Sequence, residues 1–233
     1  MMTPLRAARP LWALVLSRFL TVIFPVLAVL IAVRVIMSPL FLQLEYNRPG
    51  FPDDPFGLTR EDRLTYAPYA LDYLLYGKDI TYLGDLRFSD GETLYTVREL
   101  QHMRDVQTVT QAAYALAVLS GVLAAIAGVT MVRIPAARES LIFGLRNGAL
   151  LTILLLFTIV ILVVGSWDFF FTTFHQIFFA SGTWVFYTSD TLIRLFPEQF
   201  WFDAAITIGV LSALISLIVL LIISRVRASR PLP

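Results

Sequence analysis

The chain has 233 residues, of which 58% are hydrophobic and only 15% are charged, and its mean hydropathy is +0.74. Soluble domains average about 45–50% apolar and about 25% charged residues, so this composition excludes an ordinary water-soluble fold. The absence of cysteine excludes a disulfide, a thiolate nucleophile and a cysteine-bound metal. The net charge of +1 says little, because the charges are segregated along the chain, and the basic residues are placed for membrane topology rather than for a nucleic-acid partner.

Four segments are apolar enough to cross a bilayer, which takes about 20 helical residues at a rise of about 1.5 Å each. In chain order they are Leu11 to Met37, Val106 to Val132, Leu145 to Gly165, and Phe202 to Ser224. The first is too long for the apolar part of a signal peptide, so we interpret it as a retained helix. The sequence predicts an all-α membrane protein with four transmembrane helices and a small, mainly helical extracytoplasmic cap.

The orientation follows from an unequal distribution of charge. Residues 41–105 carry twelve acidic and seven basic side chains, and residues 166–203 carry four acidic side chains and one basic side chain. The termini and the connection between the second and third spans carry eight arginines against one acid. These arginines are Arg6, Arg9, Arg133, Arg138, Arg146, Arg225, Arg227 and Arg230. Because basic residues concentrate in cytoplasmic loops, we expect both termini in the cytoplasm and both acidic segments outside.

These features divide the chain into five parts, each with its own expected place relative to the membrane. They are the amino terminus and first transmembrane helix (1–40), the extracytoplasmic cap (41–105), the second and third transmembrane helices with a short cytoplasmic loop (106–165), an aromatic interfacial segment (166–203), and the fourth transmembrane helix with a cytoplasmic tail (204–233).

Within the cap, Thr59 and Asp62 have the spacing of a capping box, which predicts a helix from Arg60 to Tyr76 that ends at Gly77. Weak alternation from Thr81 to Phe88 predicts a short strand.

The segment from 166 to 203 contains fourteen aromatic residues, many of them Phe, and this is typical of a stretch at the bilayer edge. Gly182 is expected to interrupt it, and Ser189-Asp190 to cap a short helix. Such a segment serves either as a membrane anchor or as one wall of a lipid-binding groove.

The chain has only two histidines, His102 and His175, one in each outer segment. On a helix, Glu99, His102 and Asp105 would share one face, and a carboxylate one turn from an imidazole can hold one ring nitrogen while the other takes a proton. Ionisable groups at membrane level are costly and tend to be functional, so we predict a shared two-histidine site.

Two other uses of these residues remain open. Glu99, His102 and His175 form a possible set of metal ligands, which would suit a metal-dependent lipid or peptide hydrolase. The chain has no second Glu-x-x-His pair, and it lacks the motifs of zinc proteases, serine hydrolases and nucleotide-binding proteins. The other possibility is a membrane scaffold without catalytic activity. We expect no cofactor.

Four stretches taken together resemble a known family. They are RELQHMRDV (Arg98 to Val106), FHQIFF (Phe174 to Phe179), a turn with Trp184, and LIRLFPEQF (Leu192 to Phe200). In order and in the four-span layout, they resemble the bacterial lipoprotein intramolecular transacylases known as Lit. The resemblance implies an enzyme of the bacterial cell membrane with its active site on the extracytoplasmic side, acting on diacylated lipoproteins among membrane phospholipids.

The implied reaction moves the sn-2 acyl chain of a diacylglyceryl-cysteine to the α-amino group of the same cysteine, which gives a lyso-form lipoprotein. The resemblance assigns catalysis to His102 and His175. Because the substrate amine is the nucleophile, no Ser or Cys is needed. We expect His102, held by Asp105, to deprotonate the amine and His175 to protonate the leaving oxygen, although the reverse assignment is nearly as good. The oxyanion requires a donor, and the candidates are Arg104, Arg194 and the indole of Trp184.

Overall fold

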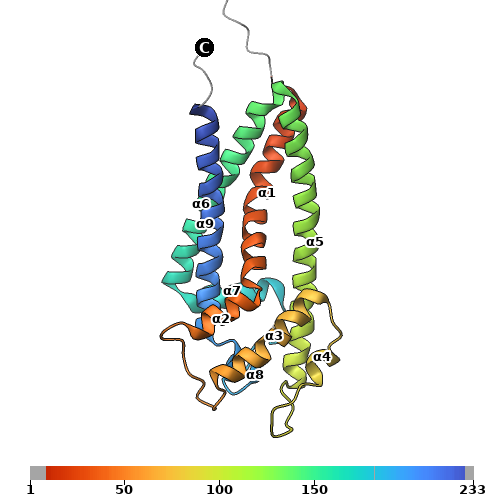
Figure 1. The fold of residues 1–233 in the computed structure, drawn as a ribbon, viewed down its shortest axis with the longest axis vertical. Coiled ribbons are helices and arrows are strands. Elements are labelled where there is room, and N and C mark those ends of the chain that lie inside the picture. Colours follow the sequence, from red (N-terminus) through yellow and green to blue (C-terminus); the bar gives the residue numbers. More distant parts are fainter. Residues whose placement is uncertain (1–8, 181, 229–233) are drawn as a thin grey trace, which may run out of the picture. The chain divides into compact units, whose positions relative to one another are not determined.

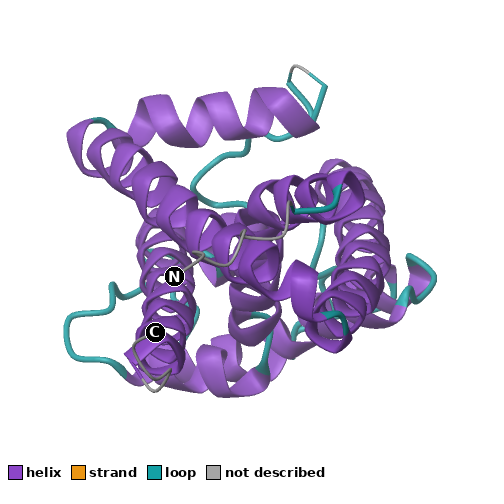
Figure 2. Ribbon diagram, turned by 90° about the horizontal axis from the view of Figure 1, so that it is seen from above, coloured by secondary structure: helices purple, strands orange, loops and turns teal. Residues whose placement is uncertain are grey.

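The structure is a computed structural model that describes residues 9–180 and 182–228, so Arg6 and Arg230 lie outside the described residues. All regular elements in the described residues are helical, and Figure 2 shows only helices and loops. In chain order (Figure 1) these are α1 (Leu11–Ile36), α2 (Pro39–Asn47), α3 (Arg60–Tyr76), α4 (Thr81–Gly84), α5 (Val97–Arg133), the 3₁₀ turn η1 (Pro135–Ala137), α6 (Arg138–Gly165), α7 (Trp167–Phe178), α8 (Thr191–Leu195) and α9 (Glu198–Ala228).

Four helices are long and apolar enough to cross a membrane, as predicted. They are α1, α5, α6 together with η1, and α9. Three of them extend well beyond the predicted apolar segments, because polar first or last turns continue the same helix outside the hydrocarbon layer. The prediction of an all-α membrane protein with four spans is confirmed.

The chain forms two compact units, and α1, α5, α6 and α9 each contribute to both. Unit 1 comprises the described residues of Met1–Ala32, Leu116–Ile159 and Gly209–Pro233. Its helices α1 and α6 approach closely through glycine. A Cβ atom at Gly148 would lie 2.6 Å from the Cβ atom of Phe24, and one at Gly144 would lie 2.7 Å from the Ser17 carbonyl oxygen. Small residues permit such close contact between membrane helices.

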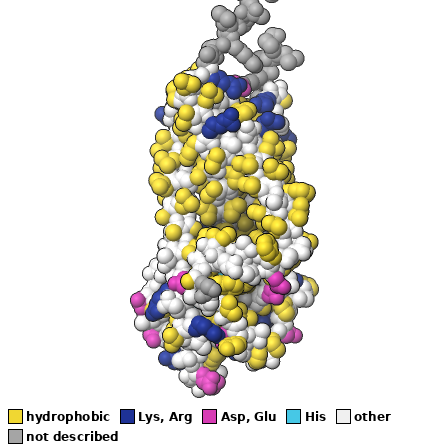
Figure 3. Space-filling view, turned by 180° about the vertical axis from the view of Figure 1, so that it is seen from behind, with side chains coloured by type: hydrophobic (Ala, Val, Ile, Leu, Met, Phe, Trp, Pro, Cys, Tyr) yellow, Lys and Arg dark blue, Asp and Glu magenta, His cyan; other side chains and the backbone are white. Residues whose placement is uncertain are grey.

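On the face that Figure 3 shows, hydrophobic side chains predominate along unit 1, and Arg side chains gather at one end of its helices. Val118 and Val22 are both about two-thirds exposed, on α5 and α1. A surface of this kind is suited to lipid rather than water. Its apolar side chains form no hydrogen bonds with water, and the backbone groups beneath them are already paired within the helices.

Unit 2 comprises Val33–Ala115 and Val160–Ile208, and it contains the cap helices together with α7 and α8. Its main core is built from α3, α4, the start of α5, and α8. The most deeply buried members are Ala70, Tyr73, Leu83, Leu94 and Leu195, and Met103 contributes from the start of α5. This core holds the first turns of α5 against α8, so the prediction of a small, mainly helical cap is confirmed.

The start and end of α3 agree with the sequence prediction. The Thr59 hydroxyl accepts a hydrogen bond from the Asp62 backbone N–H, and the Asp62 carboxylate accepts one from the Thr59 N–H. The helix runs from Arg60 to Tyr76, and Gly77 follows it with a φ of +60°, in the left-handed region.

The predicted strand from Thr81 to Phe88 is wrong. Residues Thr81–Gly84 form the short helix α4, and the Asp79 carboxylate supports its first turn by accepting hydrogen bonds from the Thr81 N–H and hydroxyl. A lone strand has no partner for its backbone groups, whereas a helical turn satisfies them locally. Within residues 9–180 and 182–228, extended pairing is limited to one bridge between Arg87 and Thr93.

Candidate active site

The two histidines lie together in unit 2. His102 is on the second turn of α5 and His175 is near the end of α7. The centres of their rings are 6.4 Å apart and the ring planes differ by 24°. No hydrogen bond joins the two rings, and the Phe179 ring lies beside both of them, 5.0 Å from that of His102 and 5.7 Å from that of His175.

Aromatic rings surround the pair. The ring centres of Phe179 and Phe186 lie 5.0 and 5.3 Å from that of His102, which is only 9% exposed. On the other side, the ring centres of Phe171 and Trp184 lie 4.1 and 4.8 Å from that of His175. These apolar walls limit the access of water to His102 and cover part of His175, and a lower dielectric strengthens any polar contact that a substrate makes there.

A hydrogen bond fixes the tautomer of His175. Its Nδ1 atom lies 2.8 Å from the Phe171 carbonyl oxygen, which can only accept, so Nδ1 carries the hydrogen. In the neutral ring, Nε2 then has a free lone pair that can take a proton. Burial lowers the pKa of His175, and the hydrogen bond to Phe171 opposes that shift only in part, so the neutral form prevails at pH 7.

Two polar atoms beside the histidines are buried without a hydrogen-bond partner in the described part of the chain. They are Nδ1 of His102 and Nε1 of Trp184. An unsatisfied buried donor or acceptor costs about 1–3 kcal/mol, and such groups in a native protein need an explanation. Their position beside His175 suggests that polar atoms of a bound substrate complete both hydrogen bonds.

The expected hydrogen bond from the His102 imidazole to the Asp105 carboxylate is not formed. The Asp105 carboxylate instead accepts one from the Gln101 amide at 3.3 Å. Arg104 also turns toward Gln101, with its guanidinium 3.2 Å from the amide oxygen, and it is exposed. The helical spacing was right, but these side chains pair along the helix surface, while His102 points into the aromatic cluster.

Glu99 has a structural role that its helical position did not suggest. Its carboxylate is fully buried, and one oxygen accepts hydrogen bonds from the Thr96 N–H and hydroxyl at 2.7 and 2.8 Å. The other oxygen accepts one from the Leu192 N–H at 2.7 Å. Glu99 thus completes a capping box at the start of α5 and also caps α8, in place of the expected Ser189-Asp190. The Thr-x-x-Glu spacing in the sequence is a signal that predicts the first of these contacts.

This arrangement removes Glu99 from the set of possible metal ligands, since both of its oxygens are already bound within the protein. Residues 9–180 and 182–228 contain no group of three or more His, Asp or Glu side chains placed to hold a metal ion. The two histidines therefore lack the third protein ligand on which the metal-dependent alternative depended.

Arg194 also serves the fold of the cap. Its guanidinium donates to the Asp54 carboxylate at 3.0 Å and to the Phe56 carbonyl oxygen at 3.2 Å. It also lies over the rings of Phe56 and Phe88. Of the three candidate oxyanion donors, only Trp184 contacts a histidine.

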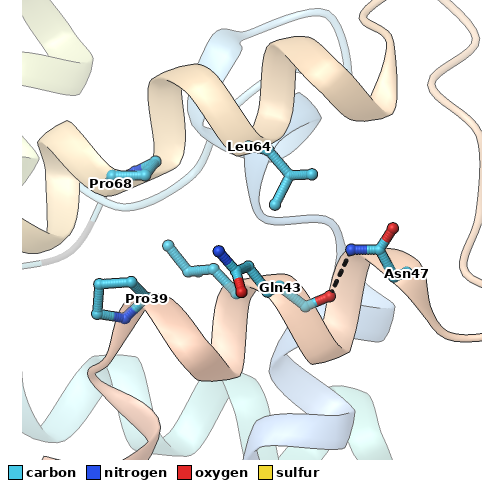
Figure 4. Close-up of a pocket in the computed structure, with 6 residues that line it drawn as sticks. Pro39, Gln43, Asn47, Leu64 and Pro68 are labelled. Atoms are coloured by element: carbon cyan, nitrogen blue, oxygen red, sulfur yellow. Dashed lines mark hydrogen bonds between the residues drawn. The ribbon is translucent and has the colours of Figure 1, made fainter.

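A cavity of about 330 Å³ lies elsewhere in unit 2, between α2 and α3. Figure 4 shows Pro39, Gln43 and Asn47 on α2 facing Leu64 and Pro68 on α3. Its lining has no titratable group, so it offers no acid–base chemistry of its own.

Residues 16–201 match the sequence model of the family described as lipoprotein intramolecular transacylase Lit. The chain belongs to the Lit family. Its sequence is 32% identical over 209 residues to an uncharacterized protein of Aquifex aeolicus (strain VF5), across 88% of this chain and 91% of that one.

Solved structures share the fold. The in meso structure of the membrane-integral Lit of Bacillus cereus superposes with a TM-score of 0.66 at 18% identity, covering 94% of this chain and 99% of that one. A variant of the same protein, with one histidine changed to alanine, superposes with a TM-score of 0.59 at 16% identity, covering 92% of this chain and 93% of that one. The resemblance seen in the histidine segments is confirmed, and the chain is a multi-pass membrane protein of an acyltransferase family.

Proposed function

We propose that this Lit family member transfers the sn-2 acyl chain of a diacylglyceryl-cysteine to the α-amino group of the same cysteine, by acid–base catalysis at His102 and His175. The observation that carries the proposal is the pair of imidazoles, 6.4 Å apart between aromatic walls, one with its tautomer fixed by a backbone carbonyl. Membership in the Lit family supplies the substrate class.

The proton balance defines what the two histidines must do. An α-amine has a pKa of about 7.7–8.0, so at pH 7 the substrate first releases one proton to solvent. The neutral nitrogen then attacks the sn-2 carbonyl carbon, forming the new C–N bond. Collapse of the tetrahedral intermediate breaks the C–O bond to glycerol. A second proton leaves the nitrogen and reaches the glycerol oxygen, which gives an amide and a free hydroxyl.

His175 is the better base of the two. The Phe171 carbonyl holds its Nδ1–H and leaves the Nε2 lone pair free, which is the orienting arrangement expected earlier for Asp105 and His102. His102 has no hydrogen-bond partner at Nδ1 within the described residues, and its ring lies 6.4 Å from that of His175, so the same substrate can contact both through its ester or glycerol oxygen. This assignment reverses the roles that sequence spacing favoured.

The surroundings of the site suit a lipid-anchored substrate. Helix α7 has no buried residue and keeps four large apolar side chains exposed, namely Phe169, Phe174, Ile177 and Phe178. Such a helix lies at the membrane surface with its apolar side chains among lipids. The acyl chains of a lipoprotein can then remain in the bilayer while the ester reaches His175.

We place this site on the extracytoplasmic side of a bacterial cell membrane, with both termini in the cytoplasm. The support is the charge distribution, since the segments 41–105 and 166–203 are acidic while the arginines concentrate in the termini and the connection between α5 and α6. Diacylated lipoproteins anchored in the outer leaflet would meet the histidines there.

The test uses purified protein and a synthetic diacylglyceryl-cysteinyl peptide, with tandem mass spectrometry of the product. Wild-type protein should give the N-acylated, S-monoacylglyceryl peptide. His102→Gln and His175→Gln should each reduce the rate by about 10²–10⁴-fold. Gln101→Ala and Gln176→Ala, exposed neighbours of the two histidines, are the matched controls. Wild-type rates in either histidine variant, or free fatty acid as the sole product, would refute the proposal.

A further inference from the structure

Transfer through a tetrahedral intermediate places negative charge on the former carbonyl oxygen of the ester. In a water-excluded site that charge needs a fixed hydrogen-bond donor, and such donors often make the largest contribution to catalysis. Neither histidine is free to serve if both handle protons. The donor must therefore come from another group that lies beside them.

The indole of Trp184 meets the requirements. Its ring centre is 4.8 Å from that of His175, and the two ring planes differ by 33°. Its Nε1 atom is buried and has no hydrogen-bond partner in the described residues. An indole N–H can only donate, so its missing partner is an acceptor atom.

We propose that the N–H of Trp184 donates a hydrogen bond to the sn-2 ester carbonyl oxygen and stabilises the oxyanion that forms on it. The inference rests on the proposed transacylase function and identifies Trp184 as a further catalytic residue of that site. The indole keeps its proton throughout. The nitrogen attacks carbon, the carbonyl π electrons move to oxygen, and they return when the glycerol C–O bond breaks.

The rival donors are engaged elsewhere. Arg194 is bound to Asp54 and to the Phe56 carbonyl, and the exposed Arg104 reaches the Gln101 amide. Using either guanidinium would require breaking contacts that exist in this structure. The Trp184 N–H is unpaired and needs no such rearrangement, which is the preorganisation that oxyanion stabilisation requires.

The segment that carries Trp184 is fixed at both sides. Before it, Gly182 adopts a φ of +83° and the Thr183 hydroxyl donates to the Ala180 carbonyl oxygen. After it, Asp190 accepts from Arg98 at 2.5 Å and from the Tyr187 N–H at 2.9 Å. Arg98 also lies over the rings of Phe186 and Tyr187. These contacts connect the Trp184 segment to α5, the helix that carries His102.

The test compares Trp184→Phe with wild type, because phenylalanine keeps an aromatic ring and removes the N–H. We expect kcat to fall by about 10²–10³-fold with little change in KM. Trp201→Phe makes the same chemical change at an exposed tryptophan of α9, and it should leave the rate unchanged. Benzothienylalanine at position 184, which has sulfur in place of N–H on a ring of the same shape, should reproduce the Trp184→Phe rate if the hydrogen bond is what matters.

Two inert analogues of the lipopeptide separate catalysis from packing. An sn-2 phosphonate resembles the anionic intermediate, and it should bind Trp184→Phe more weakly than wild type by about the factor lost in kcat. An sn-2 ether has no carbonyl, and it should bind both proteins equally.

A wild-type kcat in Trp184→Phe, or equal weakening of ether and phosphonate binding, would overturn the role of Trp184. Either result would leave the proposed function intact, provided that the histidine variants remain inactive. Full activity in the histidine variants would instead overturn the proposed function itself.

Discussion

Removing the Glu99 carboxylate should destabilise the part of unit 2 that holds His102. In Glu99→Ala, the Leu192 N–H loses its acceptor in a buried contact, and the Thr96 N–H loses its acceptor in a partly buried one. A hydrogen bond to a charged group contributes about 1.5–3 kcal/mol, and an orphaned buried donor costs about 1–3 kcal/mol. The two losses together amount to about 3–5 kcal/mol.

Glu99→Gln should lower the free energy of unfolding by about half as much as Glu99→Ala. The amide oxygen can replace one carboxylate oxygen, but the amide NH₂ faces either the Thr96 donors or the Leu192 N–H. On that side, the amide NH₂ therefore faces another hydrogen-bond donor and no hydrogen bond can form. At about 2–4 °C per kcal/mol for a chain of this size, Glu99→Ala should melt on the order of 10 °C below wild type.

The assay is the melting temperature in detergent micelles, followed by intrinsic tryptophan fluorescence at one scan rate, since membrane proteins often unfold irreversibly. Glu92→Ala is the matched control, because its side chain is exposed. If Glu99→Ala melts with wild type and Glu92→Ala, the double cap does not stabilise the protein and the reasoning fails.

Burial lowers the pKa of His175, so its imidazole should become protonated and stop acting as a base only below about pH 6.5. Above that pH the rate should rise toward pH 8, because the substrate amine loses its proton there. A transfer rate that declines above pH 6.5 would contradict the role of His175 as the base. Gly148→Ala places a methyl group 2.6 Å from Phe24, so it should cost about 1–3 kcal/mol and lower the melting temperature, whereas Gly128→Ala, with open space around its Cβ, should not. If both melt alike, α1 and α6 do not pack this closely. With both oxygens of Glu99 engaged, EDTA should leave the transfer rate unchanged, and a loss restored by Zn²⁺ would support the metal-dependent alternative.

Features of the fold that depend on local sequence were predictable. The four spans follow from runs of apolar residues, and the bounds of α3 follow from Thr59, Asp62 and Gly77. The segment from Thr81 to Phe88 was misread because weak alternation does not distinguish an exposed strand from a helical turn with loops. Its conformation is decided by the Asp79 carboxylate, which holds the turn at Thr81, and by extended pairing that reaches only Arg87 among the described residues of this segment.

For the site, the sequence identified the residues but not their contacts. Two histidines in two outer segments predicted a common site, and the rings do lie together. Helical spacing favoured Asp105 as the partner of His102, yet the one imidazole hydrogen bond in the described residues is donated by Nδ1–H of His175 to the Phe171 carbonyl oxygen. Every residue has a backbone carbonyl, so the residue type at position 171 does not indicate this partner, and only the structure identifies it.

The most direct test of the account follows the acyl chain itself. A lipopeptide with a deuterated sn-2 chain is mixed with an unlabelled lipopeptide of different peptide mass, and both are incubated with wild-type protein and with His175→Gln. Wild type should place the deuterated chain on the amine of its own peptide alone, and the variant should produce no N-acylated peptide. Deuterium on the other peptide's amine, or equal product from the variant, would contradict transfer within one molecule at this histidine pair.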